Sequence, residues 1–447
     1  MSKLTSWQHK LFYLILFLVP ANLAKHFILP SSYVSGILVD YLIPAVYLTD
    51  ILIILLLLLS YLQGLSLPVR QAGLKVKQLT LFKKTSINPL FVFLLLLIPS
   101  VIFSASPIPA IYKWFKLLEL ALFALWIKQN IDITKHFNTI INVLSASIIF
   151  QSILSLAQWF KQASVASYWF LGEQPFNSAT PGIDKITWFT GAIKIPPMGT
   201  FPHPNILGGF LAVTLPLILY KLLCKGSEPL HEPGSELHVK PGSELPVQVR
   251  NLLRLAILLL GLTTLFLTFS LSAWLAFLLI GLPSVLLLTT KIRPLKLILT
   301  YSGLFLILFS FATKLTFLAP ASSFSRRSEL TQIALKMIQD KPLTGIGLNN
   351  FTVVLENYGH ITATTRFLQP VHNIFLLIFS ETGFVGLLGF LYLLVSKLTG
   401  SELSRGVWNL KLVQIAFFTL LFLGLFDHYP LTTQQGLILF FYIFSGV

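Results

Sequence analysis

The residues of this chain best suited to chemistry lie between positions 366 and 381. Pro370 marks the start of an expected helix, and His372 and Asn373 follow it directly. An unperturbed imidazole has a pKa near 6.5, so His372 is suited to accepting a proton near neutral pH. The guanidinium group of Arg366 is suited to binding an anion through paired donors. Glu381 lies about two and a half turns further into the expected helix, where an ionisable group is a functional candidate.

Structural explanations stay open for several of these residues. Taken singly, His372 is more often an interface residue that satisfies backbone groups, and Glu381 is also explained as the buried partner of a lysine or arginine. Lys113, Lys116 and Glu119 share one face of another expected helix, where an internal ion pair is the simpler explanation. The functional alternative is that Lys113 or Lys116 binds an anionic group of the substrate.

Other groups give weaker signals. Asp427 and His428 stand at the outer end of a later expected span. As for Lys113 and Lys116, an internal ion pair is the simpler explanation and a contact with substrate is the functional alternative, here with a weaker signal. The single cysteine, Cys224, cannot form an intramolecular disulfide, and we expect neither a disulfide nor a metal framework. Gly345 and Gly347 superficially suggest a phosphate-binding loop, but they follow a helix and lack a third glycine, so a turn of the chain is favoured.

Cations are concentrated in the segment before residue 370. It holds Lys314, Arg326, Arg327, Lys336, Lys341 and Arg366 against Glu329, Asp340 and Glu356. The excess suggests a bound anion, and a solvated charged face is the alternative. Apolar residues within the segment recur at helical spacing, at Leu330, Ile333, Ala334, Met337 and Ile338. We therefore expect an amphipathic helix that ends at Lys341 and has Arg326 and Arg327 near its amino-terminal end.

The composition places these residues in a membrane protein. Of the 447 residues, 55% are hydrophobic and 11% are charged, whereas soluble domains carry about 25% charged residues. Apolar runs long enough to cross a hydrocarbon core of roughly 30 Å recur along the chain. They are continuously apolar, which favours helices over the alternating strands of a barrel. The sequence thus predicts an all-α polytopic protein with about twelve transmembrane helices.

The expected spans fix a topology for the chain. They lie near residues 11–29, 46–64, 89–104, 109–127, 139–160, 204–224, 252–270, 272–290, 297–319, 371–395, 412–427 and 431–447. Roughly 20 of the 32 Lys and Arg fall in alternate loops, which the positive-inside rule places in the cytoplasm together with both termini. Residues 161–200 and 320–370 are then outer loops. Residues 225–250 carry a short tandem repeat rich in Pro, Gly and Ser, which predicts a flexible inner linker.

Several motifs together resemble the O-antigen ligase and O-antigen polymerase superfamily. They are residues 342–351 (PLTGIGLNNF), 369–376 (QPVHNIFL) and 381–386 (ETGFVG), with weaker pieces at 327–331, 199–205 and 270–274. In the last piece, Leu271 stands where the family's arginine is expected. The resemblance suggests a division into amino-terminal helices with the first outer loop (1–198), a ligase- or polymerase-type membrane domain (199–395) and carboxy-terminal helices (396–447).

Family membership would imply a GT-C-like, metal-independent glycosyltransferase without cofactor in the cytoplasmic (inner) membrane. Such an enzyme moves a glycan from a polyprenyl-diphosphate carrier to a hydroxyl of a glycan, lipid or protein acceptor on the outer face. The positive charge of the chain would then bind membrane lipids and the lipid diphosphate, and not nucleic acid. The resemblance does not distinguish ligase from polymerase or identify the sugar.

The resemblance also implies roles for individual residues. Arg327 and Arg366 are the expected diphosphate contacts, with Arg326 as a neighbouring alternative, and His372 is either the base or a diphosphate contact. The remaining expected substrate-binding residues are Asn373, Glu381, Lys113, Lys116 and Asn205. A transporter or flippase of lipid-linked sugars is the competing function. Transporters commonly contain internal repeats, and no convincing repeat relates the two halves of this chain.

Overall fold

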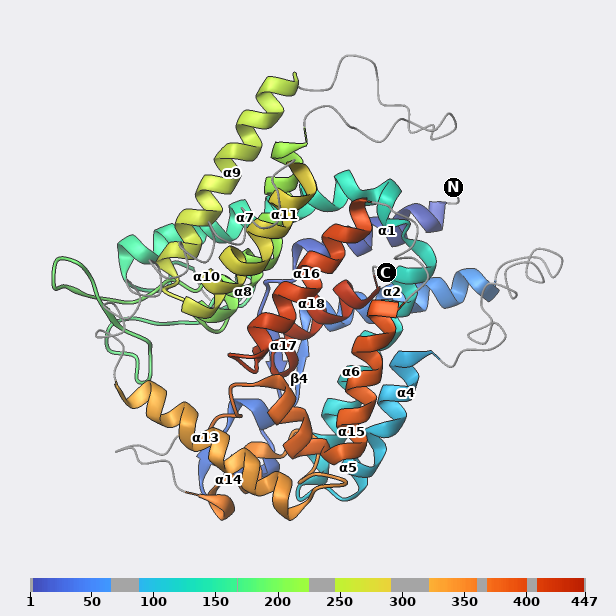
Figure 1. Ribbon diagram of the computed structural model, residues 1–447, viewed down its shortest axis with the longest axis vertical. Coiled ribbons are helices and arrows are strands. Elements are labelled where there is room, and N and C mark those ends of the chain that lie inside the picture. The colour runs from blue at the N-terminus through green and yellow to red at the C-terminus, as the bar shows by residue number, and fades with distance from the viewer. Residues whose placement is uncertain are drawn as a thin grey trace.

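The chain folds into a mostly helical protein (Figure 1). The structure is a computed structural model that describes residues 3–65, 88–166, 168–224, 246–290, 321–359, 368–399 and 408–445. In chain order, the helices are α1 Lys3–Phe17, α2 Leu48–Leu65, α4 Pro89–Leu96, α5 Ile98–Ile102, α6 Pro107–Asn130, α7 Ile133–Lys161, α8 Pro204–Leu223, α9 Val247–Leu267, α10 Leu271–Ala276, α11 Leu282–Thr289, α13 Ala321–Asp340, α14 Phe351–Tyr358, α15 Ile374–Thr399, α16 Trp408–Gly424, α17 Tyr429–Thr432 and α18 Gln434–Ser445.

Five helical segments of the described chain are long and apolar enough to cross a membrane. They are Ile133–Lys161, Pro204–Leu223, Val247–Leu267, Leu271–Thr289 and Ile374–Thr399, and shorter apolar helices occupy Leu48–Gly64, Pro89–Ile102, Lys411–Gly424 and Gln434–Ser445. The Leu271–Thr289 segment joins α10 to α11 through a π-helical turn, Phe277–Gly281. The protein is therefore a polytopic membrane protein. The expected span at 297–319 lies outside the described residues.

The first expected span, 11–29, is wrong. The helix α1 ends at Phe17, and Ala24–His26 instead form strand β1. Pro20 lacks the backbone N–H that would continue the helical ladder. The span expected at 89–104 is divided at Leu97 into α4 and α5, with Pro99 in the first turn of the second helix.

Within the described residues, three small antiparallel sheets accompany the helices, an addition to the expected all-α architecture. They pair β1 (Ala24–His26) with β4 (Ala45–Tyr47), β2 (Tyr33–Val34) with β3 (Ile37–Leu38), and β5 (Ile186–Thr187) with β6 (Ile193–Lys194). The first two sheets lie between α1 and α2, and the third lies between α7 and α8. These connections are thus built loops with their own backbone pairing.

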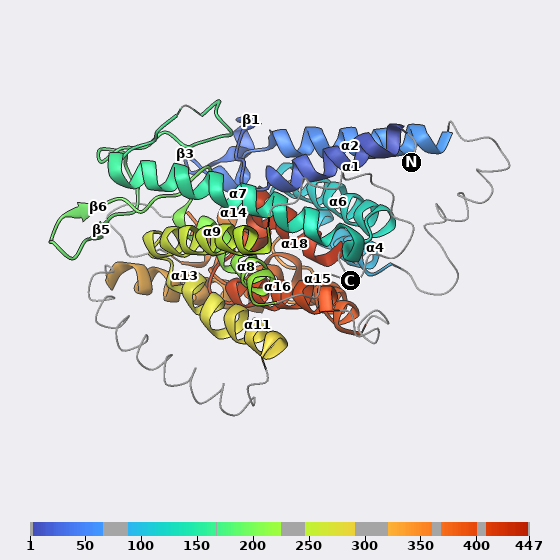
Figure 2. The ribbon, with the colours of Figure 1, turned by 90° about the horizontal axis from the view of Figure 1, so that it is seen from above.

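The helix α8 lies at the centre of the helical assembly (Figure 2). It contacts α7, α9, α10, α11 and α16, and most of its residues are buried. A Cβ at Gly209 would stand 1.6 Å from the hydroxyl of Tyr429. This close approach brings the amino-terminal end of α8 against the segment between α16 and α18.

The expected amphipathic helix is confirmed as α13. Leu330, Ile333, Ala334 and Met337 are buried in one apolar cluster with residues of α14 and α15. The helix ends at Asp340, one residue before Lys341. Its apolar face therefore packs on the protein, and it holds Arg327 at its opposite, amino-terminal part.

A glycine interrupts α15 in its first half. Gly383 has a φ of +63°, and a Cβ there would stand 2.2 Å from the carbonyl oxygen of Leu343. The loop that follows α13 supplies hydrogen bonds at this break, with Phe384 donating to Pro342 (2.8 Å) and Ile346 donating to Ser380 (3.0 Å). The backbone groups that the break releases thus find partners inside the protein, as non-helical backbone in a span must.

Candidate functional site

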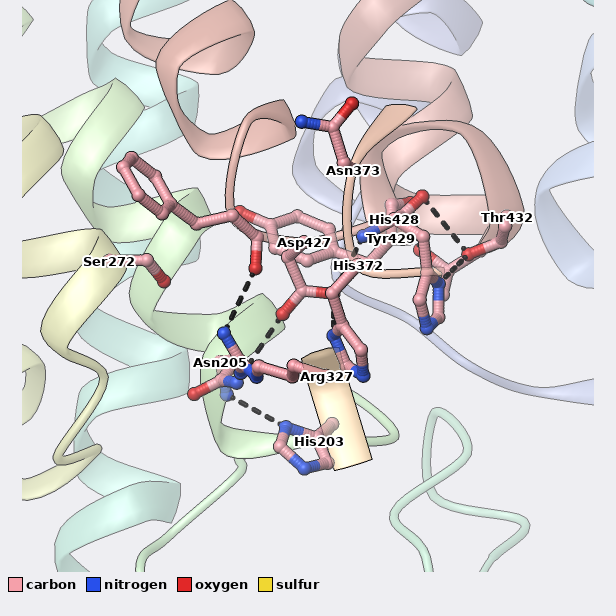
Figure 3. A network of polar contacts seen from close by, with 12 residues as sticks. His203, Asn205, Ser272, Arg327, His372, Asn373, Asp427, His428, Tyr429 and Thr432 are labelled. Atoms are coloured by element: carbon pink, nitrogen blue, oxygen red, sulfur yellow. Dashed lines mark hydrogen bonds and ion pairs between the residues drawn. The ribbon is translucent and has the colours of Figure 1, made fainter. Parts of the chain in front are cut away.

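The candidate site surrounds the carboxylate of Asp427 (Figure 3). Asp427 lies between α16 and α17, and its neighbour His428 comes from the same segment. Asn205 comes from the first turn of α8, Arg327 from α13, and His372 from the turn before α15. The site is therefore assembled from the ends of helices that are far apart in the sequence.

Asp427 is 5% exposed and receives contacts on both oxygens. Its Oδ1 accepts the backbone N–H of His428 at 2.8 Å and lies 3.5 Å from Nδ1 of His372. Its Oδ2 accepts a hydrogen bond from the Asn205 side-chain amide at 3.4 Å. Burial disfavours the carboxylate, but the contact with His372 and the nearby histidine charges outweigh it, so the pKa of Asp427 lies well below its usual range. Asp427 is thus an anion at neutral pH.

Two histidines with different surroundings lie beside this anion. The rings of His372 and His428 are 5.0 Å apart. His428 is buried, its Nδ1 lies 2.7 Å from the Thr432 hydroxyl, and the ring of Tyr41 meets it edge-on at 5.3 Å. Burial is the main cause that lowers the pKa of His428 to about 3. His428 therefore stays neutral in the physiological range.

His372 is the histidine that retains access to solvent. Its side chain is 16% exposed, and among the described residues its buried Nδ1 has no hydrogen-bond partner. The 3.5 Å separation from Asp427 is an ion-pair distance and exceeds that of an ordinary hydrogen bond. The imidazole of His372 therefore lies between solvent and a buried carboxylate.

A second histidine–carboxylate pair lies at the head of α8. Nε2 of His203 is 2.9 Å from Oδ2 of Asp184, with side chains 44% and 55% exposed, respectively. Nδ1 of His203 accepts the backbone N–H of Asn205 at 3.1 Å. Burial opposes the imidazolium, but the hydrogen bond and charge of Asp184, with the charge of Asp427, raise the pKa of His203. His203 is thus a link between the preceding loop and α8.

Arg327 brings a fixed positive charge to this cluster. Its Nη1 donates to the carbonyl oxygen of Phe426 at 3.2 Å, next to Asp427. Arg326 and Arg327 are also close enough to Asp184 to help lower its pKa against the effect of burial. The expected anion contact Arg327 is therefore in the same cluster as His372. The third expected contact, Arg366, lies outside the described residues.

Asn373 holds the beginning of α15 beside the site. Its Oδ1 accepts the backbone N–H groups of Phe375 and Leu376, each at 3.0 Å. Its Nδ2 donates to the carbonyl oxygen of Leu425 at 3.1 Å. The amide thus caps the helix that follows His372 and ties it to the segment that leads to Asp427.

Glu381 is engaged at the glycine break of α15. Its two oxygens accept the backbone N–H groups of Asn349 (2.9 Å) and Phe351 (3.1 Å). The side chain is buried. Both oxygens therefore hold the loop between α13 and α14, and Glu381 is absent from the described contacts of Asp427.

The two expected lysines have partners within the protein. Lys116 is buried and contacts Asp50 and, at 3.7 Å, Glu119. This arrangement is the internal ion pair that the sequence offered as the simpler explanation. Lys113 donates to the carbonyl oxygen of Leu431 at 2.6 Å, one residue before the threonine that contacts His428.

Local sequence patterns assigned no role to Asp184 or His203 and only a weak one to Asp427 and His428. His203 lies within the short 199–205 motif, which was a usable signal. Asp184 lies in a loop without recognisable spacing, so no local pattern connected it to the site. Its position depends on how residues 162–203 fold back onto α8.

The same cluster contains a set of donors suited to a metal. Ligand atoms of His372, Asp427 and His428 lie within 4.8 Å of one another, and this is the one such group in the described ranges. Two histidines and a carboxylate are a usual donor set for transition metals. Here, however, Asp427 already bonds His428 and Asn205, and His428 contacts Thr432. A metal would have to replace these protein contacts.

Comparison with known proteins identifies one family in this chain. Residues 256–391 match the family described as O-antigen ligase, from α9 to α15. The chain therefore contains an O-antigen ligase domain. No curated protein matches the chain. The matched segment contains Arg327, His372 and Asn373, whereas the carboxylate at the centre of the site, Asp427, lies beyond it.

Proposed function

We propose that this polytopic membrane protein, which carries an O-antigen ligase domain, transfers a glycan from a polyprenyl diphosphate to an acceptor hydroxyl. The observation that supports the proposal most is the arrangement of His372, Asp427 and Arg327. A partly exposed histidine lies beside a buried anion, and a guanidinium is bonded to the residue preceding that anion. A base and a fixed cation are the two groups that such a transfer needs.

The proposed reaction begins when the acceptor hydroxyl attacks the anomeric carbon of the donor sugar. The new bond joins the acceptor oxygen to this carbon, and the bond from the carbon to the diphosphate oxygen breaks with its electron pair. The acceptor proton passes to His372 as general base. Asp427 stabilises the resulting imidazolium and acts as a positioning residue. The proton is afterwards lost to solvent, and the polyprenyl diphosphate leaves as the anion.

Arg327 is the proposed contact for the departing diphosphate. A guanidinium fork binds phosphate oxygens in pairs, and charge on the diphosphate grows as the glycosidic bond breaks. In the described part of the chain, the hydrogen bond of the Arg327 guanidinium goes to a neutral carbonyl oxygen. Arg366 is proposed as a second contact and Arg326 as a neighbouring alternative. Lys113, Lys116 and Glu381 are proposed to support the surrounding structure.

The enzyme is proposed to belong to the GT-C-like class, with about twelve spans, and to work without metal on the outer face of the cytoplasmic membrane. Both termini then lie in the cytoplasm, in agreement with the distribution of Lys and Arg. The acceptor is a glycan, a lipid or a protein. The product distinguishes these cases, because a polymerase lengthens the lipid-linked chain and a ligase modifies another molecule.

The function is tested with purified protein in lipid nanodiscs, a polyprenyl-diphosphate glycan and an acceptor. We expect release of polyprenyl diphosphate that depends on the acceptor and continues in the presence of a chelator. A chelator-sensitive rate that is restored by metal would contradict metal independence and point to the His372, Asp427 and His428 donor set. Movement of intact donor across the membrane without release of diphosphate would contradict the proposed glycosyltransferase and identify a flippase.

A further inference from the structure

We propose that Asp184 is a positioning residue of the site and acts on Asp427 through His203 and Asn205. The inference rests on the proposed function for its catalytic consequence. Asp184 lies before strand β5 in the connection between α7 and α8, outside the segment that matches the O-antigen ligase family. A residue of this connection would thus control the geometry around a base in the turn before α15.

The first link joins Asp184 to His203. Their side chains meet at 2.9 Å between Oδ2 and Nε2. Partial desolvation raises the pKa of Asp184, but the hydrogen bond and charge of His203, followed by the charges of Arg326 and Arg327, keep this pKa below its usual value. Asp184 is therefore a lasting acceptor for the Nε2–H of His203.

The second link joins His203 to the first turn of α8. Because Nε2 donates to Asp184, the neutral ring has an unprotonated Nδ1, and this atom accepts the backbone N–H of Asn205 at 3.1 Å. The tautomer follows from the two partners. His203 thereby caps α8, and the same contact fixes the backbone of Asn205. Asp184 selects the tautomer that makes this cap possible.

The third link joins Asn205 to the carboxylate beside the base. The Asn205 amide donates to Oδ2 of Asp427 at 3.4 Å, while Oδ1 of Asp427 faces His372. A carboxylate held on one oxygen has a restricted rotation and presents the other oxygen in a fixed direction. In Figure 3, Asn205 and His203 lie on the side of Asp427 opposite Thr432. Loss of the Asn205 contact would therefore loosen the partner of His372.

The hairpin β5–β6 holds Asp184 at the required place. Trp188, at the end of β5, packs on Trp159 of α7 with ring centroids 5.0 Å apart and on Phe269 at 5.9 Å. Phe269 follows α9 and has a left-handed backbone with a φ of +53°. The aromatic contacts fix the hairpin to α7 and to the turn that follows α9. Asp184 lies two residues before β5 and is therefore held in place together with the hairpin.

The charges around His203 belong to several elements. Asp184 faces it from the loop, Asp427 from the segment after α16, Arg327 from α13, and His428 is within electrostatic range. The two carboxylates favour the protonated ring and Arg327 opposes it. Protonation places a hydrogen on Nδ1 and removes the acceptor for Asn205. The cap, and with it the positioning of Asp427, is therefore expected above the pKa of His203.

Two substitutions test whether Asp184 acts through the cap that His203 forms on α8. Asp184→Asn removes the charge that holds the His203 tautomer. His203→Asn retains an N-cap acceptor for Asn205, because asparagine is a preferred N-cap, but its side chain is too short to keep the Nε2 contact. Lys185→Ala, at the exposed residue next to Asp184, is the matched control.

We expect Asp184→Asn to lower kcat about 10- to 100-fold at pH 8, with KM for the donor nearly unchanged, as for misplaced catalytic groups. His203→Asn keeps the cap on Asn205 without the help of Asp184, so its kcat should stay close to that of the wild type and should not fall further when Asp184→Asn is added. Lys185→Ala should match the wild type. In an Asn205→Ala background, Asp184→Asn should have little further effect, because the chain is already broken. A loss from Asp184→Asn that persists in the His203→Asn background would overturn the proposal, as would additive losses with Asn205→Ala.

A second measurement keeps the test independent of activity. Carbethoxylation of His372 is followed by mass spectrometry relative to the exposed His26 in the same molecule. Asp184→Asn should raise the His372 rate and Lys185→Ala should not, because the released ring exposes Nδ1. An unchanged rate would contradict the coupling. If the wild type releases no carrier diphosphate, the proposed function fails, and the footprint still decides whether Asp184 positions His372.

Discussion

Two buried carboxylates in the same protein do different work. Glu381, inside α15, uses both oxygens to accept backbone N–H groups of one loop. Asp427, beyond the end of α16, faces a histidine, an asparagine side chain and one backbone N–H. A carboxylate saturated by backbone holds a fold together, whereas one that faces a partly exposed imidazole can stabilise a charge that appears during a reaction. The difference lies in the partners and not in the residue type.

The largest expected effect belongs to the base beside Asp427. His372→Ala should lower kcat about 10²- to 10⁴-fold, because a positioned general base contributes that much to proton transfer. The change is measured as acceptor-dependent release of polyprenyl diphosphate. His26→Ala, a change at an exposed histidine of β1, is the control. Turnover at the wild-type rate by His372→Ala would show that the site around Asp427 takes no part in the reaction.

Arg327→Ala is expected to lower kcat slightly less than His372→Ala does. Losing a preorganised group that stabilises transition-state charge typically costs about 2.7–4 kcal/mol of barrier, equivalent to a loss of roughly 10²- to 10³-fold. The measurement is kcat and KM for the lipid-linked donor. Lys336→Ala on the same helix is the matched control, since Lys336 bonds the carbonyl oxygen of Tyr358 away from Asp427. Equal losses in both variants would assign the effect to α13 as a whole.

Glu381→Gln tests the other side of the comparison. It replaces one of the two oxygens that accept backbone N–H groups by an NH2 group that cannot accept, and a buried donor left unsatisfied costs about 1–3 kcal/mol. We expect a lower thermal unfolding midpoint in detergent, with turnover per folded molecule close to that of the wild type. A stable variant with strongly reduced kcat would instead place Glu381 in the reaction and erase the distinction from Asp427.

The smallest expected effect is a pH-dependent contribution of the Asp184–His203 pair to stability. The pKa of His203 is raised in the folded protein, so its stabilisation is fully present below the unfolded value near 6.5 and is lost as pH rises through the folded pKa. The lowered pKa of Asp184 gives stabilisation that is present above about pH 3.9. The difference in Tm between wild type and Asp184→Asn should therefore be larger at pH 5.5 than at pH 9.

This last difference should be small, because both side chains are about half exposed and exposed ion pairs contribute about 0.2–1 kcal/mol. The Asp132→Asn variant provides a comparison at a helix end remote in sequence from the site. If the difference in Tm between wild type and Asp184→Asn grows from pH 5.5 to pH 9, the raised pKa of His203 is contradicted.

Local patterns located much of the protein correctly. Helical periodicity identified the apolar face of α13, since Leu330, Ile333 and Met337 are buried as expected. The expected turn at Gly345 and Gly347 is confirmed by their positive φ values of 69° and 115°. These features depend on neighbours in the sequence, so the sequence shows them. The end of α1 at Phe17 was missed because a continuous apolar run concealed the effect of Pro20 on the helix.

The sequence by itself determined the membrane character and most of the helices, because composition and periodicity are properties of short segments. It nominated His372 and Arg327 as site residues through residue chemistry together with a family resemblance, and these roles stay predictions. Tertiary structure alone decided which carboxylate meets His372 and which one holds a loop. Asp427 lies 55 positions after His372 in the chain and 3.5 Å from it in space, whereas Glu381, nine positions away, is turned into the bundle. The side chain of Asn373, which donates to the carbonyl oxygen of Leu425, ties the two segments together, and no local pattern encodes that contact.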